Sequence, residues 1–132
     1  MINSSQAVIV TGGASGIGEA TVRLIVSRGG KAAIIDLDEA AGTQLAQELG
    51  DRVIFTPADV CDESQMESAL SRIENKLSPI TGLVTCAGVS PVRFPIEEYS
   101  VEEFRRLLDN HATGTFLTCK LIGSKMALGE GG

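Results

Sequence analysis

The stretch AVIVTGGASGIG, residues 7–18, decides the fold of this chain. Its first part, residues 7–11, is a continuous apolar run of the kind found in strands that are buried on both faces of a sheet. Glycines follow at once, and residues 16–28 then read as a helix with a stop signal at Gly29. One stripe of this helix is expected to comprise Ile17, Ala20, Leu24 and Ser27. The stretch therefore predicts a strand, a glycine-rich loop and a helix in direct succession.

The loop in the middle of this stretch has the features of a diphosphate-binding loop. A dinucleotide diphosphate needs free backbone N–H groups and the positive end of a helix dipole. Gly12 lets the strand turn, Gly16 lets the main chain approach the phosphates, and Gly18 lets the helix pack against the strand. The alternative is a glycine-rich turn without a ligand. The nucleotide site is favoured because a strand precedes the loop and a helix follows it.

Strand and helix patterns alternate along the rest of the chain. Further strands are expected at residues 31–36, 52–56 and 82–86, and further helices at residues 38–49, 62–77 and 100–128, the last with a kink near Gly114. The helices are expected to begin at caps formed by Asp38, Asp62 and Ser100. Their inward positions are expected to be Ala41, Leu45, Ala46 and Leu49, then Met66, Leu70, Ile73 and Leu77. The alternation predicts an α/β fold: one domain over residues 1–132, with a Rossmann-type parallel sheet in the order 3-2-1-4 and helices on both faces.

An acidic residue ends the second expected strand. Asp36 lies 18 residues beyond Gly18, close to the ~20 expected for the acid that holds the adenosine ribose. A 2′-phosphate at ~4 Å would repel this carboxylate by roughly 1 kcal/mol in water and by about 4 kcal/mol at an effective dielectric near 20. Neighbouring Leu37 supplies no compensating cation, so NAD is favoured over NADP. The alternative, that Asp36 merely caps the next helix, is weaker because Asp38 is better placed.

The spacing T-G-x-x-x-G-x-G resembles that of the short-chain dehydrogenase/reductase family, and further marks follow in order over essentially the whole chain. The pair Asp59-Val60 resembles the family's Asp-Val pair, where the adenine is seated, and residues 85–88 (TCAG) resemble its Asn-Asn-Ala-Gly turn along the cofactor ribose. The resemblance implies the N-terminal, NAD-binding portion of such an enzyme, ending before the fifth strand. The cofactor contacts that it implies are Gly12, Ser15, Gly16, Ile17, Gly18, Asp36, Leu37, Asp59, Val60, Ala87 and Gly88.

The chain departs from the family pattern at two places. Thr85 and Cys86 replace both asparagines of the turn, and Cys86 is interpreted as a small buried apolar residue rather than a redox group. The family carries an asparagine three residues before the glycine that matches Gly114. His111 stands at that position, with Asn110 one residue earlier. A structural role for His111 is favoured over one in holding a water molecule.

The resemblance implies hydride transfer between a nicotinamide and a small carbonyl or alcohol substrate, with a tyrosine as general acid–base, a lysine four residues later and a serine that orients the substrate. The one tyrosine here is Tyr99, followed four residues later by Glu103, so no catalytic residue is assigned. The isolated 132-residue chain is expected to bind NAD(H) without turnover. Two alternatives stay open: a non-catalytic nucleotide-binding or assembly module, and a Rossmann enzyme for another nucleotide, such as a nucleoside-phosphate sugar.

Composition limits the remaining possibilities. A net charge of −6 argues against binding to nucleic acid or anionic membranes, and no apolar run approaches the ~20 residues of a membrane span. Three widely spaced cysteines fit neither a disulfide framework nor a zinc site, so reduced thiols in the cytoplasm and no metal are expected. A homo-oligomer is expected because the last helix would expose Phe104, Leu107, Leu108 and Phe116.

Overall fold

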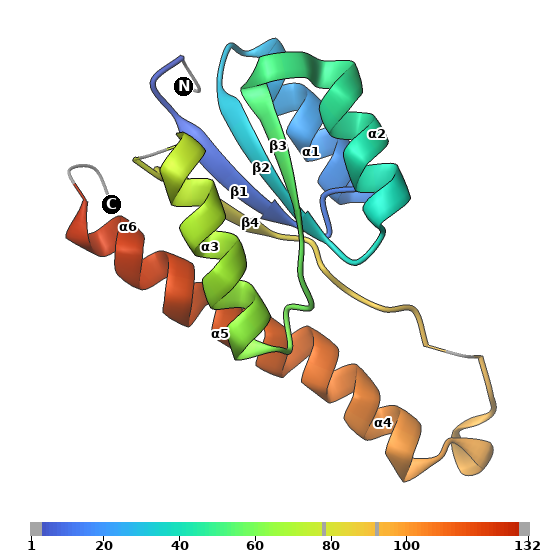
Figure 1. Cartoon of the computed structure of the whole chain (residues 1–132). Helices are drawn as coiled ribbons and strands as arrows, with labels where there is room; N and C mark the ends of the chain where they lie inside the picture. Colours follow the sequence, from blue (N-terminus) through green and yellow to red (C-terminus); the bar gives the residue numbers. More distant parts are fainter. Residues whose placement is uncertain (1–3, 78, 92, 130–132) are drawn as a thin grey trace.

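The strands of the computed structural model, which describes residues 4–77, 79–91 and 93–129, form one parallel sheet (Figure 1). They are β1 (Ala7–Thr11), β2 (Lys31–Asp36), β3 (Val53–Pro57) and β4 (Gly82–Thr85). Their order in the sheet is β3-β2-β1-β4, and all neighbouring pairs are parallel. The predicted fold class and strand order are confirmed.

Helices cover both faces of this sheet, as predicted (Figure 1). Helices α1 (Gly16–Ser27) and α2 (Glu39–Leu49) lie on one face. Helix α3 (Glu63–Leu77) lies on the other, together with a long helix that runs through residues 101–128. Two short 3-10 turns, Gly50–Arg52 and Ile96–Glu98, complete the described elements.

The strands divide the core into two clusters. Ile9 and Ile35 pack with α3 and the long helix on one face of the sheet. Their chain neighbours Val10 and Ile34 pack with α1 and α2 on the opposite face. All four side chains are fully buried, because successive residues of a strand point to opposite faces and helices cover both. This burial on both faces explains why the sequences of β1 and β2 are continuous apolar runs.

The predicted caps are confirmed. The Asp38 carboxylate accepts a hydrogen bond from the Ala41 N–H (2.9 Å), and the Asp62 carboxylate accepts one from the Gln65 N–H (3.0 Å). The Ser100 hydroxyl accepts one from the Glu103 N–H (3.1 Å). The predicted inward positions of α2 and α3 also lie in the two core clusters.

The stripe expected on α1 is not the one that faces the sheet. Its inward residues are Gly18, Val22 and Ile25, whereas Ile17 and Leu24 are 81 % and 52 % exposed. Apolar residues occur on both sides of this helix, so periodicity alone does not choose the buried side. The buried side is decided by the close approach of Gly18 to the loop after β1, because this contact turns the stripe of Gly18, Val22 and Ile25 towards the sheet.

The long helix is continuous but not α-helical throughout. It consists of α4 (Val101–Leu108), a π-helical segment (Asp109–Thr113), α5 (Gly114–Thr118), a second π-helical segment (Cys119–Gly123) and α6 (Ser124–Leu128). The irregularity expected near Gly114 is therefore a π segment that ends just before it. Gly114 itself has helical angles (φ −61°, ψ −43°), and a Cβ there would lie 2.7 Å from a methyl group of Val60. The glycine lets the long helix approach the segment that follows β3.

None of the helices within the described ranges is both long enough and apolar enough to cross a bilayer.

Candidate functional site

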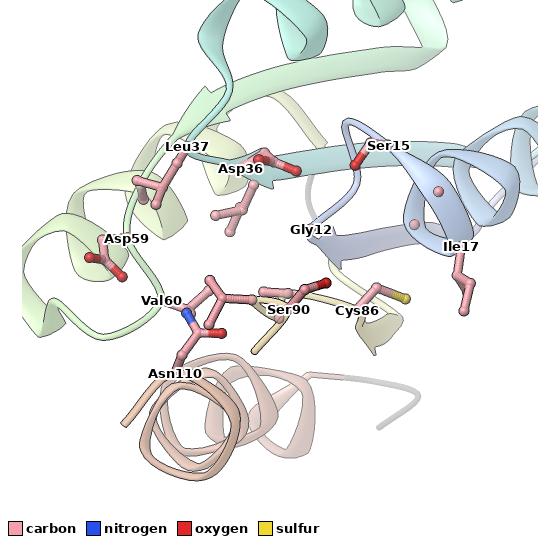
Figure 2. Close-up of a pocket in the computed structure, with 17 residues that line it drawn as sticks. Gly12, Ser15, Ile17, Asp36, Leu37, Asp59, Val60, Cys86, Ser90 and Asn110 are labelled. Atoms are coloured by element: carbon pink, nitrogen blue, oxygen red, sulfur yellow. The ribbon is translucent and has the colours of Figure 1, made fainter. Parts of the chain in front are cut away.

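A pocket of about 520 Å³ lies at the carboxyl ends of the strands (Figure 2). Every residue that the sequence analysis assigned to a cofactor lines it, from the loop after β1 to the turn after β4. The further lining residues, which the sequence analysis did not assign, are Ile35, Ala58, Cys86, Val89, Ser90 and Asn110. The carboxyl ends of parallel strands meet at one edge of the sheet, and in open α/β folds this edge is where ligands bind.

Two glycines shape the loop after β1. Gly12 has φ +65°, and a Cβ on it would lie 2.6 to 2.7 Å from backbone atoms of Cys86 and Ala87. Its N–H donates to the carbonyl oxygen of Ile35 (2.8 Å). A Cβ on Gly18 would overlap the carbonyl oxygen of Gly12. The loop is thus wedged between β2, the turn after β4 and the first turn of α1.

The open side of the same loop suits an anion. Gly16 has φ +54°, and no atom lies within 4 Å of the place where its Cβ would stand. The Ser15 side chain is exposed and makes no cap hydrogen bond to α1. The first N–H groups of a helix have no intrahelical partner and carry the positive end of its dipole. Gly16 and the first turn of α1 thus form a glycine cradle in the pocket, whose first backbone N–H groups are open to an anion such as a diphosphate.

Asp36 links the end of β2 to the glycine-rich loop. One carboxylate oxygen accepts a hydrogen bond from the Ala14 N–H (3.0 Å) and the other accepts one from the Asp38 N–H (3.1 Å). The cap of α2 is Asp38, so the alternative role of Asp36 as that cap does not hold. Each carboxylate oxygen can accept a further hydrogen bond, which leaves Asp36 able to bind a hydroxyl group in the pocket.

The segment after β3 is held by side chains on both of its sides. The Asp59 N–H donates to the Gln65 side chain (3.1 Å), and the Asp59 carboxylate accepts from the Cys61 N–H (2.9 Å). The Cys61 thiol donates to the carbonyl oxygen of Asp109 in the long helix (3.3 Å). Burial raises the pKa of this thiol, and the negative charges of Asp59 and Asp109 add to the shift. Cys61 is therefore a protonated link between the segment after β3 and the long helix.

The turn after β4 is tied to β1 through Thr11. The Thr11 carbonyl oxygen accepts from the Cys86 N–H (2.9 Å), and its hydroxyl accepts from the Ala87 N–H (3.4 Å). Thr11 is 1 % exposed. These bonds hold the turn although Thr85 and Cys86 replace the family's asparagines. Cys86 packs against the core cluster under α1 and α2, in keeping with the apolar role expected for it.

The long helix supplies the remaining wall of the pocket (Figure 2). His111 donates through Nε2 to the carbonyl oxygen of Val89 (2.9 Å), which is a structural role. Asn110 lines the pocket, and its Oδ1 is buried without a hydrogen-bond partner among the described residues. Sequence reasoning missed Asn110 as a lining residue. The only available signal was an asparagine one position away from the expected one.

Within the residues that the structure describes, no group of three or more His, Cys, Asp or Glu side chains is arranged to hold a metal ion.

Comparison with protein families gives one match over nearly the whole chain. The family model described as "short chain dehydrogenase" matches residues 6–132. The chain is 33 % identical over 127 residues to the 3-hydroxyacyl-CoA dehydrogenase type-2 of Homo sapiens, covering 92 % of this chain and 49 % of that protein. It is 38 % identical over 112 residues to the 3-beta-hydroxysteroid dehydrogenase of Comamonas testosteroni, covering 85 % of this chain and 44 % of that protein.

Solved structures resemble the chain in the same way. A short-chain type dehydrogenase/reductase from Mycobacterium ulcerans superposes with a TM-score of 0.92 at 27 % identity, covering 100 % of this chain and 50 % of the other. A 3-ketoacyl-(acyl-carrier-protein) reductase from Brucella melitensis, complexed with NADH, superposes with a TM-score of 0.86 at 27 % identity, covering 91 % and 49 %. The chain spans about half the length of the relatives that it matches.

Proposed function

This chain belongs to the short-chain dehydrogenase family, and from that premise we propose that it forms the NAD-binding half of an oxidoreductase. Members of the family bind a nicotinamide cofactor on a Rossmann fold. The proposed reaction of the whole protein is the transfer of a hydride between the nicotinamide and the carbonyl or alcohol carbon of a small substrate. The observation that carries the proposal is that the glycine cradle, Asp36 and the Asp59-Val60 pair line one and the same pocket at the strand ends.

Each part of the pocket has a defined task in this proposal. The N–H groups at the start of α1 bind the diphosphate, Asp36 accepts hydrogen bonds from the adenosine ribose, and Asp59 with Val60 borders the adenine. The bound cofactor supplies the hydride acceptor or donor. A cofactor without a 2′-phosphate is favoured because Asp36 and Asp59 line the pocket, whereas no lysine or arginine is among its described lining residues.

Replacement of Asp36 tests the choice between the two cofactors. The wild-type chain should bind NAD more tightly than NADP by about tenfold or more, since each ~1.4 kcal/mol of charge repulsion is a factor of about ten in affinity. Asp36→Ala removes both that repulsion and the carboxylate proposed to hold the adenosine ribose, so NAD affinity should fall and the two affinities should come closer together. The measurement is a titration of each dinucleotide by calorimetry, with a nucleoside-diphosphate sugar as competitor.

Asp38→Ala is the matched control for this experiment. It removes a carboxylate two residues away that caps α2 and does not line the pocket. It should lower the free energy of unfolding by about 1 kcal/mol and leave the NAD to NADP ratio unchanged. If Asp36→Ala keeps the wild-type ratio, Asp36 has no part in cofactor choice. A sugar nucleotide that outcompetes both dinucleotides would favour the alternative nucleotide enzyme.

A second candidate function is a non-catalytic nucleotide-binding module that assembles through its long helix. The observation that favours it is the exposure of large apolar side chains along that helix, among them Phe104 (55 %), Leu108 (47 %) and Phe116 (66 %). Leu107, also expected to be exposed, is half-buried. Exposed apolar surface of this kind is typical of contacts between chains. A homo-oligomer is proposed under either function.

Light scattering on the purified chain measures this association directly. We expect one defined oligomer whose mass is an integral multiple of the 13.8 kDa chain. A mixture of open-ended aggregates would contradict the assembly module.

The cytoplasm is the proposed compartment, because the three cysteines are free thiols and a reducing environment keeps them so.

A further inference from the structure

The side chain of Gln65 reaches from the first turn of α3 to the main chain of a pocket residue. Its Oε1 accepts a hydrogen bond from the Asp59 N–H (3.1 Å), and its Nε2 donates one to the Asp62 carboxylate (2.9 Å). Asp59 lines the pocket, whereas Gln65 does not. We propose that Gln65 is a positioning residue, which fixes Asp59 in the place where it receives the adenine end of the dinucleotide. This inference rests on the proposed NAD site.

Only one orientation of the Gln65 amide satisfies both contacts. A backbone N–H can only donate and an ionised carboxylate can only accept, so the amide oxygen faces Asp59 and the amide nitrogen faces Asp62. The Asp62 carboxylate also accepts from the Gln65 N–H (3.0 Å). Hydrogen bonds from the main chain and side chain of Gln65 hold the pKa of the Asp62 carboxyl below its usual range, so the carboxylate stays ionised at neutral pH. The exposed Gln65 side chain is thus held at both ends of its amide.

Capping of α3 does not by itself account for this arrangement. Asp62 precedes the first residue of α3, and Gln65 is at the third helical position. A glutamine at that position typically returns a hydrogen bond to the N–H of the cap residue. Here the Asp62 N–H donates to the Asp59 carbonyl oxygen (3.0 Å) instead, and the Gln65 oxygen binds an N–H three residues before the cap. The side chain of Gln65 therefore serves the segment after β3 rather than the end of the helix.

Asp59 is held through three of its own groups. Its N–H is bound by Gln65, its carbonyl oxygen by the Asp62 N–H, and one carboxylate oxygen by the Cys61 N–H (2.9 Å). A ligand that meets an already ordered side chain loses less affinity to ordering than one that must immobilise it. Without the Gln65 amide, the Asp59 N–H would have water as its partner. The segment would then be ordered only when the dinucleotide binds, and the affinity for the adenosine end should fall.

The test replaces Gln65 by methionine, which keeps the length of the side chain and removes both polar atoms. NAD, ADP and inorganic pyrophosphate are titrated by calorimetry into the 132-residue chain. Gln65→Met should weaken the binding of NAD and ADP by about three- to tenfold, the effect of about one hydrogen bond. Pyrophosphate carries no adenine and should keep its affinity for the glycine cradle. Gln47→Met is the matched control, because Gln47 is exposed on α2 and lies outside this pocket.

Amide hydrogen exchange without ligand provides a second readout, because it reports on the contact itself. The Asp59 N–H should exchange faster in Gln65→Met than in the wild type, and at the wild-type rate in Gln47→Met. If Gln65→Met does not fold, Gln65→Ala decides by the same measurements.

Three outcomes would overturn this inference alone: wild-type affinity for NAD in the variant, an equal loss of affinity for pyrophosphate, or an unchanged exchange rate of the Asp59 N–H. The equal loss would assign Gln65 a general structural role. A wild-type chain that binds neither NAD nor ADP would overturn the proposed function as well.

Discussion

The isolated 132-residue chain is expected to bind NADH and yet leave a panel of ketones unreduced. General acid–base catalysis contributes typically ~10²–10⁴-fold to rate, and no tyrosine, lysine or histidine is among the described residues that line the pocket. The assay follows NADH absorbance in the presence of each ketone, at chain concentrations where binding has been established by titration. Sustained oxidation of NADH that depends on ketone would contradict this prediction.

The expected lack of turnover follows from where the tyrosine and the two lysines of the long helix lie. Tyr99 precedes the long helix, its hydroxyl oxygen is buried without a partner among the described residues, and it does not line the pocket. Lys120 and Lys125 form ion pairs with Glu63 (2.7 Å) and Glu74 (3.4 Å) of α3. None of these three side chains is among the residues that line the pocket.

Two controls make a negative result meaningful. A full-length member of the family, assayed with the same ketones, shows that the conditions support turnover. Tyr99→Phe in the present chain removes the phenol while preserving the ring, and should leave NADH binding and the absence of turnover as they are. A background rate that falls in Tyr99→Phe would assign this tyrosine a role that its position does not support.

Gly18→Ala is expected to lower both the stability of the chain and its affinity for NAD. The added Cβ would overlap the Gly12 carbonyl oxygen, and Gly12 cannot retreat because it is itself packed against Ala87. Overpacking of this kind costs typically about 1–3 kcal/mol, which outweighs the gain of about 1 kcal/mol that alanine has over glycine within a helix. The diphosphate cradle would be displaced with the loop, so NAD affinity should fall by about tenfold or more.

Gly50→Ala is the matched control for this substitution. Gly50 has φ +72°, no atom lies within 4 Å of its Cβ position, and it is remote from the pocket. Its ψ of −155° places it in a backbone region that is essentially restricted to glycine, so the substitution should cost about 1–3 kcal/mol through backbone conformation alone and leave NAD affinity unchanged. Chemical denaturation measures the free energy of unfolding, and calorimetry measures affinity. A Gly18→Ala chain with wild-type stability and affinity would show that the close contact is relieved without cost.

Much of the fold follows from local sequence signals. The apolar run of β1 predicts its own burial, and Asp38, Asp62 and Ser100 mark the starts of helices because each side chain can bind an N–H two or three positions later. The candidate pocket was also predictable as a set of residues. Its members follow strands, and parallel strands bring their carboxyl ends to one edge.

The features that could not be predicted are those that only tertiary packing decides. Helix α1 has apolar residues on two sides, and the contact between Gly18 and Gly12 selects the stripe that faces the sheet. The π-helical segments carry no distinctive residue type. One of them sets how Asn110 and His111 are presented, so the place of Asn110 in the pocket could not be read from helical periodicity. The two hydrogen bonds that Thr11 accepts from the turn after β4 could likewise not be predicted, because they depend on the pairing of β1 with β4.

The pocket draws its walls from segments that are widely separated along the chain, after β1, β2, β3 and β4 and on the long helix. A dinucleotide bound there would contact all of these segments at once and so stabilise the folded state. At a dinucleotide concentration of a hundred times Kd, it would add about 2.7 kcal/mol to the free energy of unfolding. Proteases cleave the unfolded form, and bound cofactor would lower the fraction of the protein that is unfolded. The lifetime of this polypeptide in a cell would therefore increase with the concentration of its cofactor.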